Sequence, residues 1–197
     1  MYDFLSAMIL KKILSFAAAI IKLFIFFYLI SIYSVNADNN KYYSDDKGIV
    51  SLMYHRFNEN QYPSTNIKIA IFKKQIEQIN NKKINFMLPS NFDKNFNLKK
   101  ERKQILLTID DAFSSFYENA WPILKKEKIP FILFVSTQPV GKYGYMTWEQ
   151  IKEIEKEDFA FIGNHSHSHE YLVEYNFNEF KKDIDTSIRI LDRKSVV

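Results

Sequence analysis

Two groups of side chains in this chain have the types and spacing of a catalytic metal site. The first is the adjacent pair of carboxylates Asp110 and Asp111, which follows an apolar run that begins at Ile105. The second is the stretch Gly163–His169, which contains three of the four histidines. Imidazoles and carboxylates are common ligands of divalent ions that activate water. The sequence therefore predicts a hydrolytic metal site.

The spacing within each group defines how it could contribute to one site. His165 and His169 are four residues apart, so a single helical turn would place both on one face. Two imidazoles and one carboxylate leave positions open for water and substrate, and a second carboxylate can act as general base. Neighbouring aspartates on a regular strand point to opposite sides. Asp110 and Asp111 therefore share a site only if the chain turns after them.

Each group also has a plainer interpretation. The aspartates could mark an ordinary strand-to-loop transition, with both acids solvated or one capping the next helix, and the histidines could lie in a surface loop without metal. We favour the metal site because His55, the aspartate pair and the histidine stretch each follow an apparent strand. Functional residues of α/β folds collect at the carboxyl ends of parallel strands.

The elements that must position these groups follow from hydrophobic periodicity. Apolar runs predict strands over residues 49–55, 84–88, 104–109, 129–135 and 159–162. Helical spacing predicts helices over 69–82, 116–128, 148–156 and 177–191, with Thr147 as an N-cap and Pro122 marking a kink or a late start. Alternating strands and helices indicate an α/β fold with a parallel sheet.

Composition narrows the class of protein. With 197 residues and 47% hydrophobic content, the chain can form one ordinary domain with a sizeable core. It has no cysteine, which excludes disulfides and cysteine-ligated zinc. Its net charge is +4, but the basic residues are scattered and form no patch with interleaved aromatics. We therefore expect no nucleic-acid partner.

The first 37 residues have the pattern of a secretory signal. Lys22 precedes the apolar stretch Leu23–Val35, and Val35–Ala37 offers small residues for cleavage before a polar segment. The alternative is a retained anchor, because Ile13–Val35 exceeds the ~20 residues that span a bilayer. Lys22 would then lie within the membrane, which is costly. We favour the cleaved signal.

This N-terminal pattern sets the expected domain organisation and location. Residues 1–37 would be a signal peptide or membrane anchor, 38–47 a polar linker, and 48–197 the folded domain. We expect an exported protein that is periplasmic, extracellular or anchored at the outer face of the membrane. Any membrane contact would be made only through the N-terminal segment.

The motifs resemble those of the polysaccharide deacetylases of the NodB-homology type, carbohydrate esterase family 4. Thr108–Ala112 is similar to the family's first motif, Thr-Phe-Asp-Asp-Gly, and His165–His169 is similar to its second, His-Ser/Thr-x-x-His. Met53–Arg56 resembles the lead-in strand of the branch that includes the poly-N-acetylglucosamine deacetylases. Tyr145–Trp148 resembles a segment between the two motifs. The resemblance runs from about Gly48 to Val197.

This resemblance implies a role for each motif residue. Asp110 would be the catalytic base, and Asp111, His165 and His169 would bind a divalent metal, usually zinc. Ser166 would support the loop by hydrogen bonding. His167 occupies the family's variable position and is not expected to be a ligand. His55 would either line the substrate pocket or simply cap its strand.

The family fold is a deformed (β/α) barrel, of which this chain would form the N-terminal, incomplete portion. Nothing in the sequence matches the family's later motifs, an Arg-Pro-Tyr-like segment that orients the base and a late histidine that acts as general acid. Arg193–Val197 is expected to begin the next strand. Ala112 stands where the family has glycine, so the turn would be strained if it needs a positive φ.

The implied function is hydrolysis of N-acetyl groups on an N-acetylglucosamine-type polysaccharide, with release of acetate. One alternative is a catalytically inactive, truncated remnant that binds metal or glycan at the cell envelope. Another metal-dependent hydrolase, such as a phosphoesterase, would predict more acidic or histidine ligands than the sequence offers.

Overall fold

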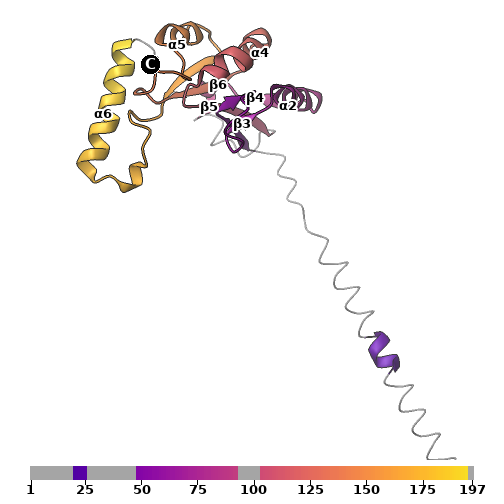
Figure 1. Ribbon diagram of the computed structural model, residues 1–197. Helices are drawn as coiled ribbons and strands as arrows, with labels where there is room; N and C mark the ends of the chain where they lie inside the picture. Colours follow the sequence, from indigo (N-terminus) through magenta and orange to yellow (C-terminus); the bar gives the residue numbers. More distant parts are fainter. Residues whose placement is uncertain (1–19, 26–47, 93–102, 195–197) are drawn as a thin grey trace, which may run out of the picture. The chain divides into compact units, whose positions relative to one another are not determined.

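The computed structural model describes residues 20–25, 48–92 and 103–194 (Figure 1). The chain divides into two units between Asp45 and Asp46, and each is described by itself. In the first unit, residues 20–25 are helical. No described helix combines the length and apolar character needed to cross a bilayer. Most of the predicted signal segment and all of the predicted linker lie outside the described residues.

A parallel sheet organises the second unit, as the alternating pattern predicted. Its strands are β1 (Ile49–Tyr54), β4 (Asn85–Phe86), β5 (Gln104–Asp110), β6 (Phe131–Val135) and β7 (Ala160–Asn164), and the main order is β1-β5-β6-β7. β1 pairs along one edge of β5, so β4 and β6 share its other edge, at its beginning and its end respectively. A separate parallel pair contains β2 (Arg56–Phe57) and β3 (Asn66–Ile67).

Helices follow the strands and join them by parallel crossovers. They are α2 (Ile69–Asn81), η1 (Pro89–Asn91), η2 (Phe116–Ala120), α4 (Trp121–Glu127), α5 (Trp148–Glu155), η3 (Leu172–Glu174) and α6 (Phe177–Lys194). All the predicted strands and helices are present, with bounds that differ by a few residues. The Thr147 cap is confirmed, because its side chain and that of Gln150 form a reciprocal capping box at the start of α5.

The core fixes β5 in place. Nearly every position of this strand is buried, as expected for a parallel strand covered on both faces. Leu107 and Ile109 belong to the main hydrophobic cluster, together with Phe72 of α2, Leu124 of α4 and Ile151 of α5. By strand alternation, Thr108 and Asp110 point to the opposite face. Packing of Leu107 and Ile109 in the core therefore fixes the position of Asp110 at the end of β5.

The predicted helix over 116–128 is helical from its first residue to Glu127. Phe116–Ala120 forms a π-helical turn, and α4 continues directly from it, with Pro122 as its second residue. Proline has no N–H to donate to the preceding turn, and the π-helical turn shifts the hydrogen-bond pattern at this point. Pro122 thus marks a change of helix type within the helix, and the late start is wrong.

The expectation that Arg193 begins another strand is wrong. Arg193 and Lys194 form the last turn of α6, and residues 195–197 lie outside the described part of the chain. The helix continues because Leu191 is still buried in the core. Two basic side chains at its carboxyl end also complement the helix dipole.

Gly163 of β7 has no room for a side chain, which gives a test of the packing. A Cβ there would lie 2.6 Å from Cε1 of Phe134 and 3.1 Å from Cγ2 of Ile132, both on β6. We expect Gly163→Ala to lower the free energy of unfolding by about 1–3 kcal/mol through overpacking, measured by urea denaturation. In a Phe134→Leu background the additional cost should be smaller. Additive costs would contradict this account.

Candidate metal centre

The candidate site lies at the carboxyl ends of strands β5 and β7, which flank β6 in the sheet. Asp110 is the last residue of β5, and His165 comes directly after Asn164, the last residue of β7. Because β5, β6 and β7 are adjacent and parallel, these ends meet at one edge. The structure therefore brings together the two groups that the sequence singled out.

A left-handed turn allows both aspartates to serve this site. Asp111 has φ 73° and Ala112 has φ 57°, so the chain leaves the strand geometry immediately after Asp110. The Ala112 carbonyl accepts a hydrogen bond from Met146 N–H at 2.9 Å, and its side chain is fully buried. The expected strain at the position of the family's glycine is present, because non-glycine residues disfavour this region.

Asp111, His165 and His169 converge closely enough to hold one metal ion. Asp111 Oδ1 lies 2.8 Å from His169 Nε2 and 3.4 Å from His165 Nε2. This buried oxygen nevertheless accepts no well-aligned hydrogen bond from the described residues. An oxygen and two imidazole nitrogens that face one point, without satisfying each other by hydrogen bonds, fit the donor set of a divalent cation.

Electrostatics support the ionised state of the carboxylate in this group. Burial by itself would raise the pKa of Asp111, but the close contact with His165 and the charges of His169 and His165 outweigh it and lower the pKa. The same contact with Asp111 raises the pKa of His165, against the opposing effect of burial. Each of the two side chains thus favours the charged form of the other.

Asp110 differs from its neighbour. Burial is the main cause that raises its pKa, and the nearby histidines only partly oppose it. Its Oδ1 is buried and has no hydrogen-bond partner among the described residues. Its Oδ2 lies 3.9 Å from Nε2 of His55. A carboxylate in this state can take a proton from water beside the three-residue group.

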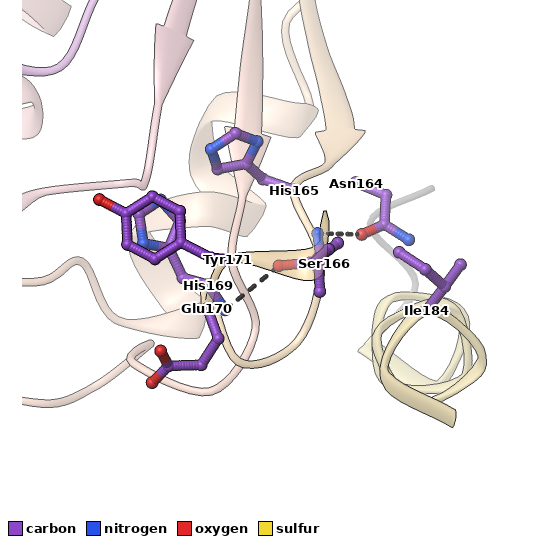
Figure 2. A pocket seen from close by; sticks show the side chains of 8 residues that line it. Asn164, His165, Ser166, His169, Glu170, Tyr171 and Ile184 are labelled. Carbon is purple, nitrogen blue, oxygen red and sulfur yellow. Dashed lines mark hydrogen bonds between the residues drawn. The ribbon is translucent and has the colours of Figure 1, made fainter. Parts of the chain in front are cut away.

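The histidine stretch is not the single helical turn that the spacing indicated. Ser166 and His169 have φ values of 69° and 62°, and no helix covers residues 165–169. Local side chains take the backbone donors instead: Ser166 N–H donates to Asn164 Oδ1 at 2.8 Å, and His169 N–H donates to Ser166 Oγ at 3.2 Å (Figure 2). The two imidazoles meet through an irregular loop, called here the histidine loop (residues 165–169).

His167 lies outside the three-residue group. Its Nδ1 is 2.8 Å from Thr137 Oγ1, in the segment after β6. Three residues that hold the histidine loop lie outside the sequence motifs. Thr137 and Ser136 follow β6, and the Ser136 hydroxyl donates to the His165 carbonyl at 2.8 Å. Asp183 binds the loop from α6. In the sequence, Ser136 and Thr137 could be recognised as polar residues directly after a buried strand, and Asp183 by its helical spacing from the apolar Leu191.

A cavity of about 590 Å³ adjoins the two imidazoles (Figure 2). Besides His165 and His169, it is lined by Asn164, Ser166, Glu170, Tyr171, Leu172 and Ile184. His55 does not line this cavity and lies beside Asp110 instead. The site therefore has space for a ligand on the side of the histidine loop.

Comparison with known proteins identifies the family. The family model described as polysaccharide deacetylase matches residues 97–196, about half of the chain, and this span contains both motifs. The chain belongs to the polysaccharide deacetylase family. The poly-beta-1,6-N-acetyl-D-glucosamine N-deacetylase of Staphylococcus aureus (strain MRSA252) is 29% identical over 92 residues, which cover 44% of this chain and 32% of that protein. The chain thus matches about a third of the length of this curated relative.

Solved structures of this family share the fold. IcaB from Ammonifex degensii superposes with a TM-score of 0.67 and 26% identity, covering 77% of this chain and 71% of IcaB. The Streptococcus pyogenes deacetylase PplD, solved in complex with acetate, gives a TM-score of 0.65 at 23% identity over 74% of this chain and 68% of PplD. The parallel α/β sheet is therefore that of NodB-type deacetylases.

Two neighbouring histidines provide a matched test of the metal centre. His169→Ala removes a donor within 2.8 Å of Asp111, whereas His167→Ala removes an imidazole outside the group. We expect His169→Ala to weaken Zn²⁺ binding by at least roughly 10–100-fold, because that is the loss of affinity when only a residue that orients a ligand is removed. His167→Ala should bind within a few-fold of the unmodified chain. Equal losses, measured by isothermal titration, would contradict the assignment.

The pKa shifts also predict how metal binding depends on pH. A raised pKa means that His165 holds its proton more tightly than an ordinary histidine, so protons compete with the metal at higher pH. Asp111 has a lowered pKa and stays ionised over the same range. We expect Zn²⁺ affinity to fall as the pH drops, starting above the titration range of a free imidazole. Chelator competition at several pH values between roughly 8 and 5 measures this. An affinity that falls only below that range would refute the prediction.

Proposed function

We propose that this chain is a zinc-dependent N-deacetylase that acts on an N-acetylglucosamine-type polysaccharide and releases acetate. One observation carries the proposal: Asp110, with an unpartnered buried oxygen, stands beside the Asp111–His165–His169 group. A free base next to a metal-binding group is the arrangement that amide hydrolysis by activated water requires. The substrate class follows from the printed name of the Staphylococcus aureus relative.

The residues of the site have separate tasks in this reaction. Asp111, His165 and His169 would hold the ion, which supplies Lewis-acid polarisation of the acetyl carbonyl and makes water more acidic. Asp110 accepts a proton from the water whose oxygen attacks the carbonyl carbon. The C–N bond then breaks, acetate leaves, and the sugar amine takes up a proton. Burial of Asp110 raises its pKa toward the working range of a general base.

His55 would act beside Asp110 rather than at the metal. Its Nε2 is 3.9 Å from Asp110 Oδ2, longer than a hydrogen bond. At this distance the imidazole can contact a substrate group that lies over Asp110. We assign it to substrate binding.

We also propose that the sheet forms the front part of a deformed (β/α) barrel. The uninterrupted parallel order from β1 to β7 supports this. So do apolar side chains of α6 that face solvent in the described structure: Phe177 is 75% exposed, Phe180 41% and Ile188 44%. In a closed barrel such residues would pack against neighbouring elements.

For location, we propose export, with the protein placed in the periplasm, outside the cell or at the outer membrane face. The support is the sequence pattern of residues 1–37, in which basic residues precede an apolar stretch and a small-residue cleavage site. A polymeric glycan substrate at the cell envelope is consistent with that placement.

Acetate release is the direct test. The full chain, loaded with Zn²⁺, is incubated with N-acetylglucosamine oligomers, and Asp110→Asn is compared with Asp111→Asn. We expect Asp110→Asn to bind Zn²⁺ yet lose activity by about 10²–10⁴-fold, the usual contribution of a general base. Asp111→Asn should lose both metal binding and activity. Unchanged acetate release by Asp110→Asn would overturn the role of that residue.

A second candidate is a protein that binds metal or glycan without hydrolysing it. It is favoured by the surroundings of Asp110, because no arginine in the described part of the chain lies in contact with this carboxylate. An unmodified chain that binds Zn²⁺ stoichiometrically but releases no acetate would support this candidate over the deacetylase.

A further inference from the structure

We infer that Asp183 of α6 is a positioning residue for the metal centre, because its carboxylate fixes the histidine loop between the two imidazole ligands. This inference rests on the proposed metal site. Asp183 Oδ1 accepts the His167 N–H at 2.7 Å, and Oδ2 accepts the Ser168 N–H at 2.9 Å. One carboxylate thus binds two successive backbone donors in the middle of the segment that carries His165 and His169.

The loop depends on side chains for its backbone hydrogen bonds. The five successive N–H groups from Ser166 to Glu170 all donate to side-chain oxygens, which belong to Asn164, Asp183, Ser166 and Ser168. Asn164, Ser166 and Ser168 are part of the same segment and move with it. Asp183 is the acceptor for these donors that comes from another element.

The opposite side of the loop is attached to the sheet. Thr137 N–H donates to the Ser166 carbonyl at 3.2 Å, and Gln138 N–H donates to the His167 carbonyl at 2.9 Å. The His165 N–H donates to the Val135 carbonyl at 3.0 Å. The histidine loop is therefore held on one side by hydrogen bonds with the end of β6 and the residues that follow it. On the other side it is held by Asp183, which accepts hydrogen bonds from two loop amides.

This attachment opposes strain in the loop. Ser166 and His169 both have positive φ values, a conformation that is strained in non-glycine residues and persists only where surrounding contacts impose it. Asp183 is 7% exposed and forms no ion pair with the described residues. Hydrogen bonds from the two loop amides hold its charge instead, and such charge-assisted bonds are stronger than neutral ones.

An asparagine cannot replace this carboxylate. Its amide has one oxygen to accept an N–H, and its NH₂ group would face the second donor. One loop amide would then lose its partner, and the distance between the two imidazoles would no longer be fixed. Metal affinity should fall although no ligand has been removed.

The test compares two substitutions on the same helix. Asp183→Asn alters the carboxylate that binds the histidine loop, whereas Asp185→Asn removes the same charge from an exposed position that pairs with Lys181. We expect Asp183→Asn to bind Zn²⁺ roughly tenfold more weakly, as for other residues that orient ligands. Its bound Co²⁺ should also give an altered visible spectrum. Asp185→Asn should stay within about twofold of the unmodified chain. Equal affinities for Asp183→Asn and the unmodified chain would overturn the inference.

A second variant covers the case in which Asp183→Asn does not fold. Asp183→Glu keeps the charge and both oxygens and does not lower helix propensity, but its extra methylene displaces the carboxylate from the loop. We expect at least threefold weaker Zn²⁺ binding with an unchanged circular dichroism spectrum, and unaltered binding would refute the positioning role. If the unmodified chain binds no metal, the proposed function fails. If it binds metal and both Asp183 variants bind equally well, only this inference fails.

Discussion

A buried carboxylate at the end of a parallel strand is the constraint on which this structure depends. Asp111 is 5% exposed, and a buried charge is costly unless opposite charge or well-placed donors surround it. Two imidazoles supply that compensation, at 2.8 and 3.4 Å from one oxygen. They come from a loop that follows a different strand, so the rest of the unit must keep the two strand ends together.

The two adjacent aspartates show how one short segment can support two chemical roles. The left-handed turn at Asp111 separates their surroundings, although both remain buried. Asp111 contacts the histidines, and its pKa is lowered, whereas Asp110 lies among weaker compensating charges, and burial raises its pKa. When the pKa values of two neighbouring acids are driven apart, the acid with the lowered pKa is suited to remain charged, and the acid with the raised pKa is suited to exchange a proton.

Four of the eight non-glycine residues with positive φ in the described part of the chain lie at this site. Asp111, Ala112, Ser166 and His169 all have positive φ values, and all four lie within or beside the two motifs. Rigid elements surround them: buried β5 on one side, and β6 and α6 about the histidine loop. Strained backbone in a functional site persists because its surroundings over-determine it. The same surroundings fix the positions of Asp111, His165 and His169 relative to one another.

The sequence by itself determined the elements and the identity of the candidate ligands. Apolar runs located every strand of the main sheet, and helical spacing located its larger helices, because burial leaves a direct mark on residue type. The motifs also identified Asp110, Asp111, His165 and His169 as candidates, because few functions other than a metal site place carboxylates and imidazoles directly after buried strands. The local sequence led to a wrong prediction where tertiary contacts override it. Arg193 was expected to begin a strand, but packing of Leu191 extends α6 through Lys194.

Only the tertiary structure decided how these residues meet. The spacing of His165 and His169 fits a helical turn, but hydrogen bonds from the loop amides to side-chain oxygens of Asn164, Ser166 and Asp183 impose an irregular loop. Nothing local to the motif indicates that a carboxylate on the following helix binds that loop, or that Thr137 holds His167 away from Asp111. Such contacts join residues far apart in the chain. Periodicity reports which side of an element is buried, whereas the partner met there is set by the packing of the whole fold.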